Sequence, residues 1–196
     1  AINPGARVYM APAIAGHVGS DAAAVALAEA SGAIEDTVLV VDVGTNAEII
    51  LATPGAIAAA SSPTGPAVEG AEISSGQRAA PGAVERVRID PLTLEAHVKA
   101  IGSDLWSNED GFAAASAEPG VTGLCGSGLI DAVGEMFLAG IITADGIIRP
   151  ELADGSPRVV RDGRTARYVL RDGPRELHIT QGDVRAVQLA KAALYA

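Results

Sequence analysis

Three short apolar runs separated by turns dominate the first third of the chain. They cover residues 38–43, 47–51 and 56–60, and a Gly-Thr-Asn turn joins the first two. Apolar runs of this length, rich in β-branched residues and bounded by turn signals, are typical of strands buried on both faces. The pattern therefore predicts a β-hairpin centred on Gly44 and a third strand that extends its sheet.

Helical signals flank these strands. An alanine-rich helix is expected over 22–30, where Ser20 or Asp21 can cap the start and Gly32 can supply the stop. A second, short helix is expected over 67–76, because it begins beside a proline, which is tolerated in a first turn. Both helices lie next to the predicted strands in the sequence.

Two longer helices are expected further along the chain. One follows the glycine cluster at 120–128 and carries apolar residues at helical spacing over 129–137. The other covers 184–195, and its start carries Thr180 and Asp183 in an acidic variant of the capping box. Its apolar stripe indicates that it packs against the rest of the protein.

Between the short and the long helices the apolar period changes to two. Residues 84–89 predict a strand, Asp90 and Pro91 a turn, and 92–100 a second strand with its apolar side chains on one face. Residues 103–120 form the most loop-like stretch of the sequence. This region therefore predicts a hairpin followed by a long loop.

The segment 158–179 contains two Asp-Gly pairs, at 162–163 and 172–173, that separate short apolar segments. Asp-Gly is a strong turn signal in β-hairpins. The segment therefore predicts a small, solvent-facing β-meander.

Composition narrows the class of protein. The chain has 196 residues, of which 48% are hydrophobic and 19% are charged, which is typical of a globular protein. The formal net charge of −10 argues against a nucleic-acid partner, because phosphates need a basic surface. A single cysteine, Cys125, excludes an internal disulfide and a cysteine-held iron–sulfur cluster within this chain, and it favours a reduced, cytoplasmic location. The apolar runs are too short to predict a membrane helix.

The hairpin turn carries the leading candidates for chemistry. Asp42 is placed at the end of an apolar strand, and Gly44 allows close backbone approach. Thr45 and Asn46 add two hydrogen-bonding side chains, and turn N–H groups can point at an anion. These residues predict a phosphate and Mg²⁺ site. An ordinary hairpin with a solvated polar tip stays open as the alternative.

Two further carboxylates have a structural and a functional interpretation. Asp21 at a helix start can cap the helix, or it can orient a water molecule or a Mg²⁺ ion beside a bound phosphate. Glu69 can interact with a helix dipole, or it can face a ligand. The sequence leaves both pairs of alternatives open.

The glycine cluster before the third helix is the second strong signal. Gly126, Ser127 and Gly128 belong to a G-x-x-G-x-G pattern that opens a helix, where backbone N–H groups can meet an anion. The spacing matches neither the dinucleotide-binding G-x-G-x-x-G nor a P-loop, so these two classes are disfavoured. Close packing of the helix on a sheet is the alternative role for the glycines. Cys125 beside them is expected to be a packed hydrophobe.

Five motifs together resemble the ATP-dependent reductive activators of corrinoid proteins. In chain order the motifs are Val18-Gly19-Ser20-Asp21, Val41-Asp42-Val43-Gly44-Thr45-Asn46-Ala47-Glu48, Gly65-Pro66-Ala67-Val68-Glu69-Gly70-Ala71, Gly123-Leu124-Cys125-Gly126-Ser127-Gly128-Leu129-Ile130-Asp131 and Ile179-Thr180-Gln181-Gly182-Asp183-Val184-Arg185. They span nearly the whole chain. The family belongs to the superfamily of sugar kinases, acetate kinase, heat-shock chaperones and actin.

The resemblance implies an α/β fold: an actin-like, ribonuclease H-like ATPase lobe with a mixed β-sheet flanked by helices. Residues 1–196 would form part of the second lobe, with β-rich insertions at 83–101 and 158–179. The implied activity is reduction of Co(II) to Co(I) in a corrinoid protein of methyl transfer, driven by ATP and an iron–sulfur electron donor. The corrinoid protein is the implied partner, and a homodimer is one oligomeric state left open.

The resemblance also implies a set of site residues. Asp21 and Asp42 would be catalytic, and Asp42 and Thr45 would hold Mg²⁺. The residues implied to bind ATP are Gly44, Thr45, Asn46, Glu48, Glu69, Gly126, Ser127 and Gly128. In this pattern the hairpin corresponds to the second phosphate loop, and Asp21 to the acid that sugar kinases place near the γ-phosphate.

The sequence departs from the family pattern in several places. Ala47 stands where the family usually has Gly, and Val68 where it usually has Phe. Nothing resembles the iron–sulfur domain, the first phosphate loop or the Gly-Gly adenosine motif. The chain also starts at Ala1 without Met and stops at Ala196 inside an apparent helix. We therefore expect a segment of a longer protein, with the iron–sulfur cluster in the missing N-terminal part, that alone binds nucleotide weakly and reduces nothing.

Two other functions fit the same residues. A small-molecule kinase of the superfamily would use Asp21 to deprotonate a substrate hydroxyl. A non-catalytic docking module would bind a corrinoid protein through its acidic surface and the loop around Trp106. Substrate-stimulated phosphoryl transfer would distinguish the kinase, and nucleotide-independent binding would distinguish the docking module.

Overall fold

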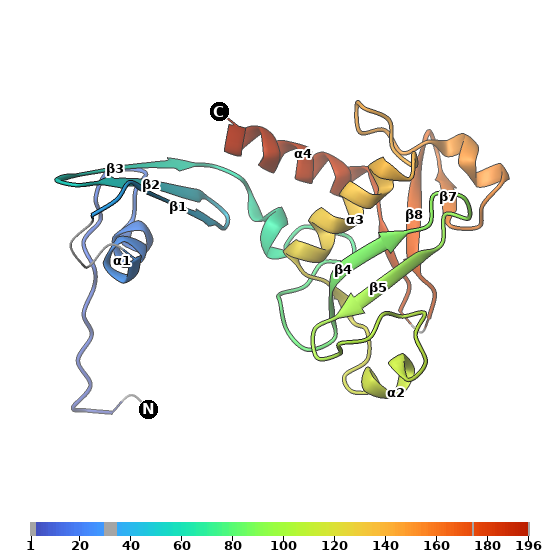
Figure 1. Cartoon of the computed structure of the whole chain (residues 1–196), viewed down its shortest axis with the longest axis horizontal. Coiled ribbons are helices and arrows are strands. Elements are labelled where there is room, and N and C mark those ends of the chain that lie inside the picture. The colour runs from blue at the N-terminus through green and yellow to red at the C-terminus, as the bar shows by residue number, and fades with distance from the viewer. Residues whose placement is uncertain (1–2, 30–34, 174, 196) are drawn as a thin grey trace. The chain divides into compact units, whose positions relative to one another are not determined.

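The computed structural model describes residues 3–29, 35–173 and 175–195 (Figure 1). The chain divides into two compact units, Ala1–Pro63 and Thr64–Ala196. Each unit is treated by itself below. The expected helix stop at Gly32 lies outside the described residues.

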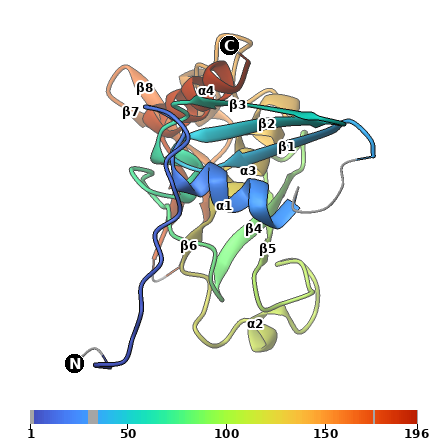
Figure 2. The same cartoon turned by 90° about the vertical axis from the view of Figure 1, so that its left-hand side faces the viewer.

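The N-terminal unit is a three-stranded antiparallel sheet with one helix, as the sequence predicts. Strands β1 (Val38–Val43), β2 (Ala47–Thr53) and β3 (Ala56–Ser62) follow one another in the sheet. Helix α1 (Ser20–Glu29) lies against the sheet (Figure 2). Its core consists of Val18, Ala22 and Ile50, with partly buried Val25, Ala26 and Val40 around them.

The prediction that β1 is buried on both faces is wrong for this chain. Val40 pairs with Ile50 and faces α1, whereas Leu39 and Val41 point to the opposite face because successive side chains of a strand alternate. Leu39 is 61% exposed and Val41 46% exposed. Apolar composition alone cannot distinguish a strand covered on one face from a strand covered on both.

The C-terminal unit contains the remaining elements. They are η1 (Pro66–Glu69), β4 (Ala83–Ile89), β5 (Ala96–Ala100), α2 (Phe112–Ala115), β6 (Gly123–Leu124), α3 (Gly126–Leu138), η2 (Pro150–Asp154), β7 (Val159–Asp162), β8 (Thr165–Arg171), β9 (Leu177–Ile179) and α4 (Gln181–Tyr195). Strands β5, β4 and β6 form a mixed sheet in that order, and β7, β8 and β9 form an antiparallel sheet. Helix α3 packs on β4 (Figure 1).

One continuous core joins these elements. It includes Val84 of β4, Leu129 and Met136 of α3, Tyr168 of β8 and Val184 of α4. Tyr168 is fully buried, and its hydroxyl donates a 2.8 Å hydrogen bond to the carbonyl oxygen of Leu94. Burial raises the pKa of the Tyr168 phenol. The mixed α/β class that the sequence predicts is confirmed.

The β-meander is present as predicted, but it does not simply face solvent. Leu170 of β8 and Leu177 and Ile179 of β9 are almost completely buried and belong to the core. Strands this short bury their apolar face only against another element. The Asp-Gly turns identify the hairpins without showing which face is covered.

Two predicted elements are shorter than expected. The helix expected over 67–76 is only the 3₁₀ turn η1, because Gly70 adopts a left-handed conformation (φ 76°) and ends it. The strand expected over 92–100 begins at Ala96. Before it, the Asp90 carboxylate accepts hydrogen bonds from the N–H groups of Leu92 and Thr93 (2.8 and 2.9 Å), so the backbone turns instead of extending.

Among the described residues, no helix combines the length and the apolar character needed to cross a membrane.

Candidate functional site

The turn between β1 and β2 has the geometry of a tight polar tip. The Gly44 N–H donates a 2.8 Å hydrogen bond to the Asn46 carbonyl, which closes the turn. Asp42, Thr45 and Asn46 are exposed. Because the Gly44 N–H is hydrogen-bonded inside the turn, a ligand at this tip would contact the exposed side chains and the other backbone groups.

Three polar side chains form a row across the sheet beside this turn. Asp42 on β1 pairs in register with Glu48 on β2, and Glu48 pairs with Ser61 on β3. Register partners share a face. Glu48 is only 5% exposed and accepts a 3.2 Å hydrogen bond from the Ser61 hydroxyl. The buried Glu48 is therefore tied to its neighbour strand, and Asp42 is the accessible carboxylate of the row.

Helix α1 covers the face of the sheet that carries this row. Val18 and Ala22 pack on Ile50, which is two residues from Glu48 on β2. Asp21 is exposed, and its Oδ1 accepts a 2.8 Å hydrogen bond from the Ala22 N–H. The first turn of α1, including Asp21, is thus anchored on the same face as Asp42.

A pocket in the N-terminal unit adds residues that the sequence did not single out. It is lined by Gly16, His17, Asn46, Ser61 and Pro63, and its volume is about 610 Å³. Pockets of about 300–1,000 Å³ are typical of small-molecule and cofactor sites. His17 directly precedes the Val18–Asp21 motif, which is the sequence signal that could have identified it.

The glycine cluster of the C-terminal unit has a packing role in the structure. A β-carbon on Gly126 would overlap with the carbonyl oxygen of Val68, and one on Gly128 would overlap with that of Val84. The two glycines therefore let the first turn of α3 approach η1 and β4 closely. Ser127 between them is exposed and lies 3.2 Å from the Cys125 sulfur.

Cys125 itself is a packed residue, as expected. It is 3% exposed, and its thiol donates a 3.3 Å hydrogen bond to the Val84 carbonyl. A buried thiol in this position is not placed to act as a nucleophile.

The predicted site residues fall into two groups. Asp21, Asp42 and the Gly44–Glu48 turn belong to the N-terminal unit, and Glu69 and the Gly126–Gly128 turn belong to the C-terminal unit. The structure describes each group in its own unit. Their convergence on one nucleotide stays a prediction.

The chemistry of the donors fits magnesium with a bound phosphate. Asp42 and Thr45 offer exposed oxygen atoms, which are the ligands Mg²⁺ prefers. In the part of the chain that the structure describes, no three His, Cys, Asp or Glu side chains gather as a ready-made metal site. Mg²⁺ usually keeps several waters and binds through one or two carboxylates plus substrate phosphates, so two protein oxygens suffice.

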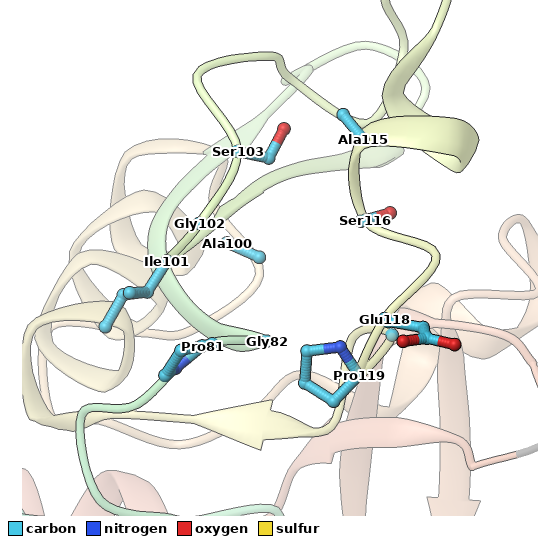
Figure 3. A pocket seen from close by; sticks show the side chains of 11 residues that line it. Pro81, Gly82, Ala100, Ile101, Gly102, Ser103, Ala115, Ser116, Glu118 and Pro119 are labelled. Atoms are coloured by element: carbon cyan, nitrogen blue, oxygen red, sulfur yellow. The ribbon is translucent and has the colours of Figure 1, made fainter.

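Other hollows of the C-terminal unit are less suited to a polar ligand. The one shown in Figure 3, between Pro81, Gly82 and Pro119, measures about 30 Å³. That volume is about a tenth of the smallest typical small-molecule site. A groove between α3 and α4, about 340 Å³, is lined mainly by apolar residues such as Phe137 and Val187.

Comparison with known proteins points to one family. The family model described as the C-terminal domain of RACo, the ASKHA domain, matches residues 36–196. The corrinoid activation enzyme RamQ of Eubacterium limosum is 35% identical over 206 residues, which cover 99% of this chain and 31% of that protein. The [Co(II) methylated amine-specific corrinoid protein] reductase of Methanosarcina barkeri is 42% identical over 78 residues, covering 40% of this chain and 14% of that protein.

A solved structure agrees with the sequence comparisons. The reductive activator for corrinoid, iron-sulfur protein matches with a TM-score of 0.79 and 30% identity, covering 95% of this chain and 28% of that chain. The chain spans less than a third of the length of each of these relatives. The family model covers both β-rich segments and the four sequence motifs from Val41 onward, so the chain belongs to the family of the C-terminal ASKHA domain of RACo, among the reductive activators of corrinoid proteins.

Proposed function

We propose that this chain is part of the ATPase lobe of a reductive activator that uses ATP and an iron–sulfur donor to reduce Co(II) to Co(I) in a corrinoid protein. The observation that carries the proposal is the exposed Asp42–Asn46 tip, whose Asn46 borders a pocket of about 610 Å³. This tip lies in the segment that matches the ASKHA family. The names of the relatives supply the class of partner, a corrinoid protein.

Each residue of the tip has a role in the proposed site. Asp42 and Thr45 hold Mg²⁺, which neutralises charge on the phosphates when it is bound. Asn46 binds phosphate oxygens from the pocket wall, where its side chain can donate hydrogen bonds. Asp21, at the start of α1, orients the attacking water. Fixing α1 on Ile50 keeps Asp21 on the Asp42 face of the sheet.

The second group of residues contributes from the C-terminal unit. Glu69 and the Gly126–Gly128 turn bind the nucleotide in the proposed site, and Glu48 supports Asp42 through the cross-strand row. In our proposal residues 1–196 form part of the second lobe, with 83–101 and 158–179 as β-rich insertions. The first lobe belongs to the rest of a longer polypeptide, in line with the greater length of the relatives.

The electron donor of the proposed reaction belongs elsewhere in that polypeptide. Cys125 is the chain's single cysteine, and it is buried and hydrogen-bonded, so this chain cannot supply the ligands of a cluster. ATP is needed because reduction of Co(II) to Co(I) is uphill for ordinary iron–sulfur donors. Nucleotide binding can drive it only through a different affinity for two states of the activator and its partner.

Replacement of Asp42 by Asn in the full-length protein tests the proposal. The change removes a charged Mg²⁺ ligand while keeping the shape of the side chain. We expect ATP hydrolysis and Co(I) formation to fall by at least about 100-fold, the usual effect of losing one preorganised charge-stabilising group. Reduction of the protein's own iron–sulfur centre should be unchanged. Hydrolysis is measured by phosphate release and Co(I) by its absorption spectrum.

Asp104→Asn is the matched control, because Asp104 is fully exposed and forms a 3.6 Å ion pair with Lys99. It should hydrolyse ATP at the wild-type rate. Unchanged turnover in D42N would contradict the assignment of Asp42 and with it the proposed site.

A further inference from the structure

Residues 65–77 run as a strap between the starts of α3 and α4. Two glycines with positive φ, Gly65 (79°) and Gly70 (76°), bracket η1, which carries Glu69. η1 packs on both α3 and α4. The position of Glu69 therefore depends on how the strap is held at these two helix starts.

Asp183 holds the strap at the α4 end. Its Oδ1 accepts hydrogen bonds from the N–H (3.0 Å) and the hydroxyl (3.3 Å) of Ser74, which is 109 residues earlier in the chain. Its Oδ2 accepts a 2.8 Å hydrogen bond from the Thr180 N–H, and its own N–H donates to the Thr180 hydroxyl (3.3 Å). Asp183 is 3% exposed. The carboxylate therefore completes the capping box of α4 and binds the strap at the same time.

The strap is also held at the start of α3 and by β9. The carbonyl of Val68 lies so close to Gly126 that no side chain fits there. Ser75 is 2% exposed; its carbonyl accepts a 2.8 Å hydrogen bond from Leu124, and its hydroxyl accepts a 3.0 Å hydrogen bond from His178. These contacts fix the strap in one path between two sheets and two helices.

We propose that Asp183 is a positioning residue for nucleotide binding: by holding Ser74 it fixes the strap and thereby places Glu69. The inference rests on the proposed function, because Glu69 matters only if the chain binds a nucleotide. A capping box alone needs no contact outside its own helix start, whereas Asp183 gives one of its two oxygens to a distant segment. Asp183 touches no ligand in this role and acts through the strap.

Hydrogen exchange in the full-length protein tests the positioning directly and without nucleotide. Asp183→Asn should speed exchange of the amides of 66–76 by about tenfold, because Asn has no charge and only one acceptor oxygen for the donors that the two carboxylate oxygens serve. Gln181→Ala is the matched control: Gln181 also tethers the first turn of α4, but to Ile148 and Gly146 (2.9 and 2.7 Å). It should leave exchange of 66–76 unchanged.

MgATP affinity of the same proteins, measured by calorimetry, tests the link to Glu69. We expect D183N to raise the dissociation constant by about tenfold, and D183N combined with Glu69→Gln to bind no worse than E69Q alone, because the two residues act as one unit. Ser74→Ala, at an exposed residue, keeps the backbone contact and should show a smaller rise. It carries the same tests if D183N fails to fold.

The hydrogen-exchange experiment and the MgATP calorimetry distinguish a failure of the inference from a failure of the proposed function. Faster exchange in 66–76 with non-additive affinities supports the inference. Unchanged exchange in 66–76, or additive effects of D183N and E69Q, overturns it. If the wild-type protein binds no MgATP, the proposed function fails, and the role of Asp183 in nucleotide binding fails with it, whereas the exchange result still decides whether Asp183 holds the strap.

Discussion

The two units of the chain differ in the size of their hydrophobic cores and in the exposure of their carboxylates. The N-terminal unit rests on a small core of Val18, Ala22 and Ile50, and its candidate residues Asp21 and Asp42 are exposed. In the C-terminal unit one core runs through both sheets, α3 and α4. The exposed carboxylates Asp21 and Asp42 are accessible to a ligand, whereas Asp131 and Asp183 of the C-terminal unit accept hydrogen bonds from backbone N–H groups of distant segments.

The largest effect should come from truncating the larger core. Met136 of α3 is completely buried, so Met136→Ala should lower the free energy of unfolding by about 3 kcal/mol through lost burial and the cavity left behind. Leu39→Ala in β1, at a side chain 61% exposed, should change the free energy of unfolding by no more than about 0.5 kcal/mol. Urea unfolding of the chain, followed by circular dichroism, measures both.

Trp106, the chain's single tryptophan, reports on the C-terminal unit alone. Its ring lies 4.2 Å from the Arg88 guanidinium, so its fluorescence is sensitive to the fold around β4. If Leu39→Ala lowered the free energy of unfolding as much as Met136→Ala, the contrast between the two units would fail. Such a result would mean that the exposed face of β1 contributes to stability as much as the core of the C-terminal unit does.

Local sequence signals account for much of the fold. The runs around Gly44 predict β1 to β3, since turn residues and short apolar runs determine hairpins locally. The Thr180–Asp183 spacing predicts the start of α4, and both expected hydrogen bonds of the box are present. The glycine cluster predicts α3, which starts at Gly126.

What the sequence could not predict depends on contacts between distant segments. The exposure of Leu39 and the burial of Leu177 follow from which elements pack on each sheet, and periodicity does not contain that information. The Ser74–Asp183 contact joins residues 109 positions apart. The pocket residue His17 meets Asn46 only because the turn before α1 is folded next to the hairpin tip. The roles of Asp42 and Asp21 stay predictions.

A smaller loss in the free energy of unfolding should distinguish Asp131, which accepts a backbone hydrogen bond, from the exposed Asp42. Asp131 of α3 accepts hydrogen bonds from the Val87 N–H (2.9 Å) and from the Arg86 side chain (3.0 Å), and Asp131→Ala leaves the Val87 amide without this acceptor. We expect a loss of about 1–2 kcal/mol in the free energy of unfolding, mostly from that amide, because the ion pair with the exposed Arg86 contributes little.

Asp42→Ala is the counterpart of that change in the N-terminal unit. Asp42 is exposed, so its replacement should alter the free energy of unfolding by less than about 0.5 kcal/mol. Thermal and urea unfolding of both variants make the comparison. Equal losses would show that Asp42 is as much a structural residue as Asp131, which would weaken its assignment to a ligand.

The smallest effect should appear at acid pH, in the turn before β5. The backbone N–H groups of Thr93 and Leu92 donate to the Asp90 carboxylate and hold its pKa below the usual 3.8. A carboxyl group whose pKa is lower in the folded state stabilises that state above its unfolded pKa, and this stabilisation is lost as the pH falls through the folded pKa. As the pH falls below about 4, the wild-type chain should therefore lose stability more steeply than Asp90→Asn, whose side chain does not titrate. NMR titration of the Asp90 carboxyl carbon measures its pKa, and Trp106 fluorescence during unfolding measures the free energy of unfolding.

Parallel curves of stability against pH for the two proteins would show that the charge of Asp90 does not stabilise the turn. The contrast between the units would then rest on apolar packing and on carboxylates such as Asp131.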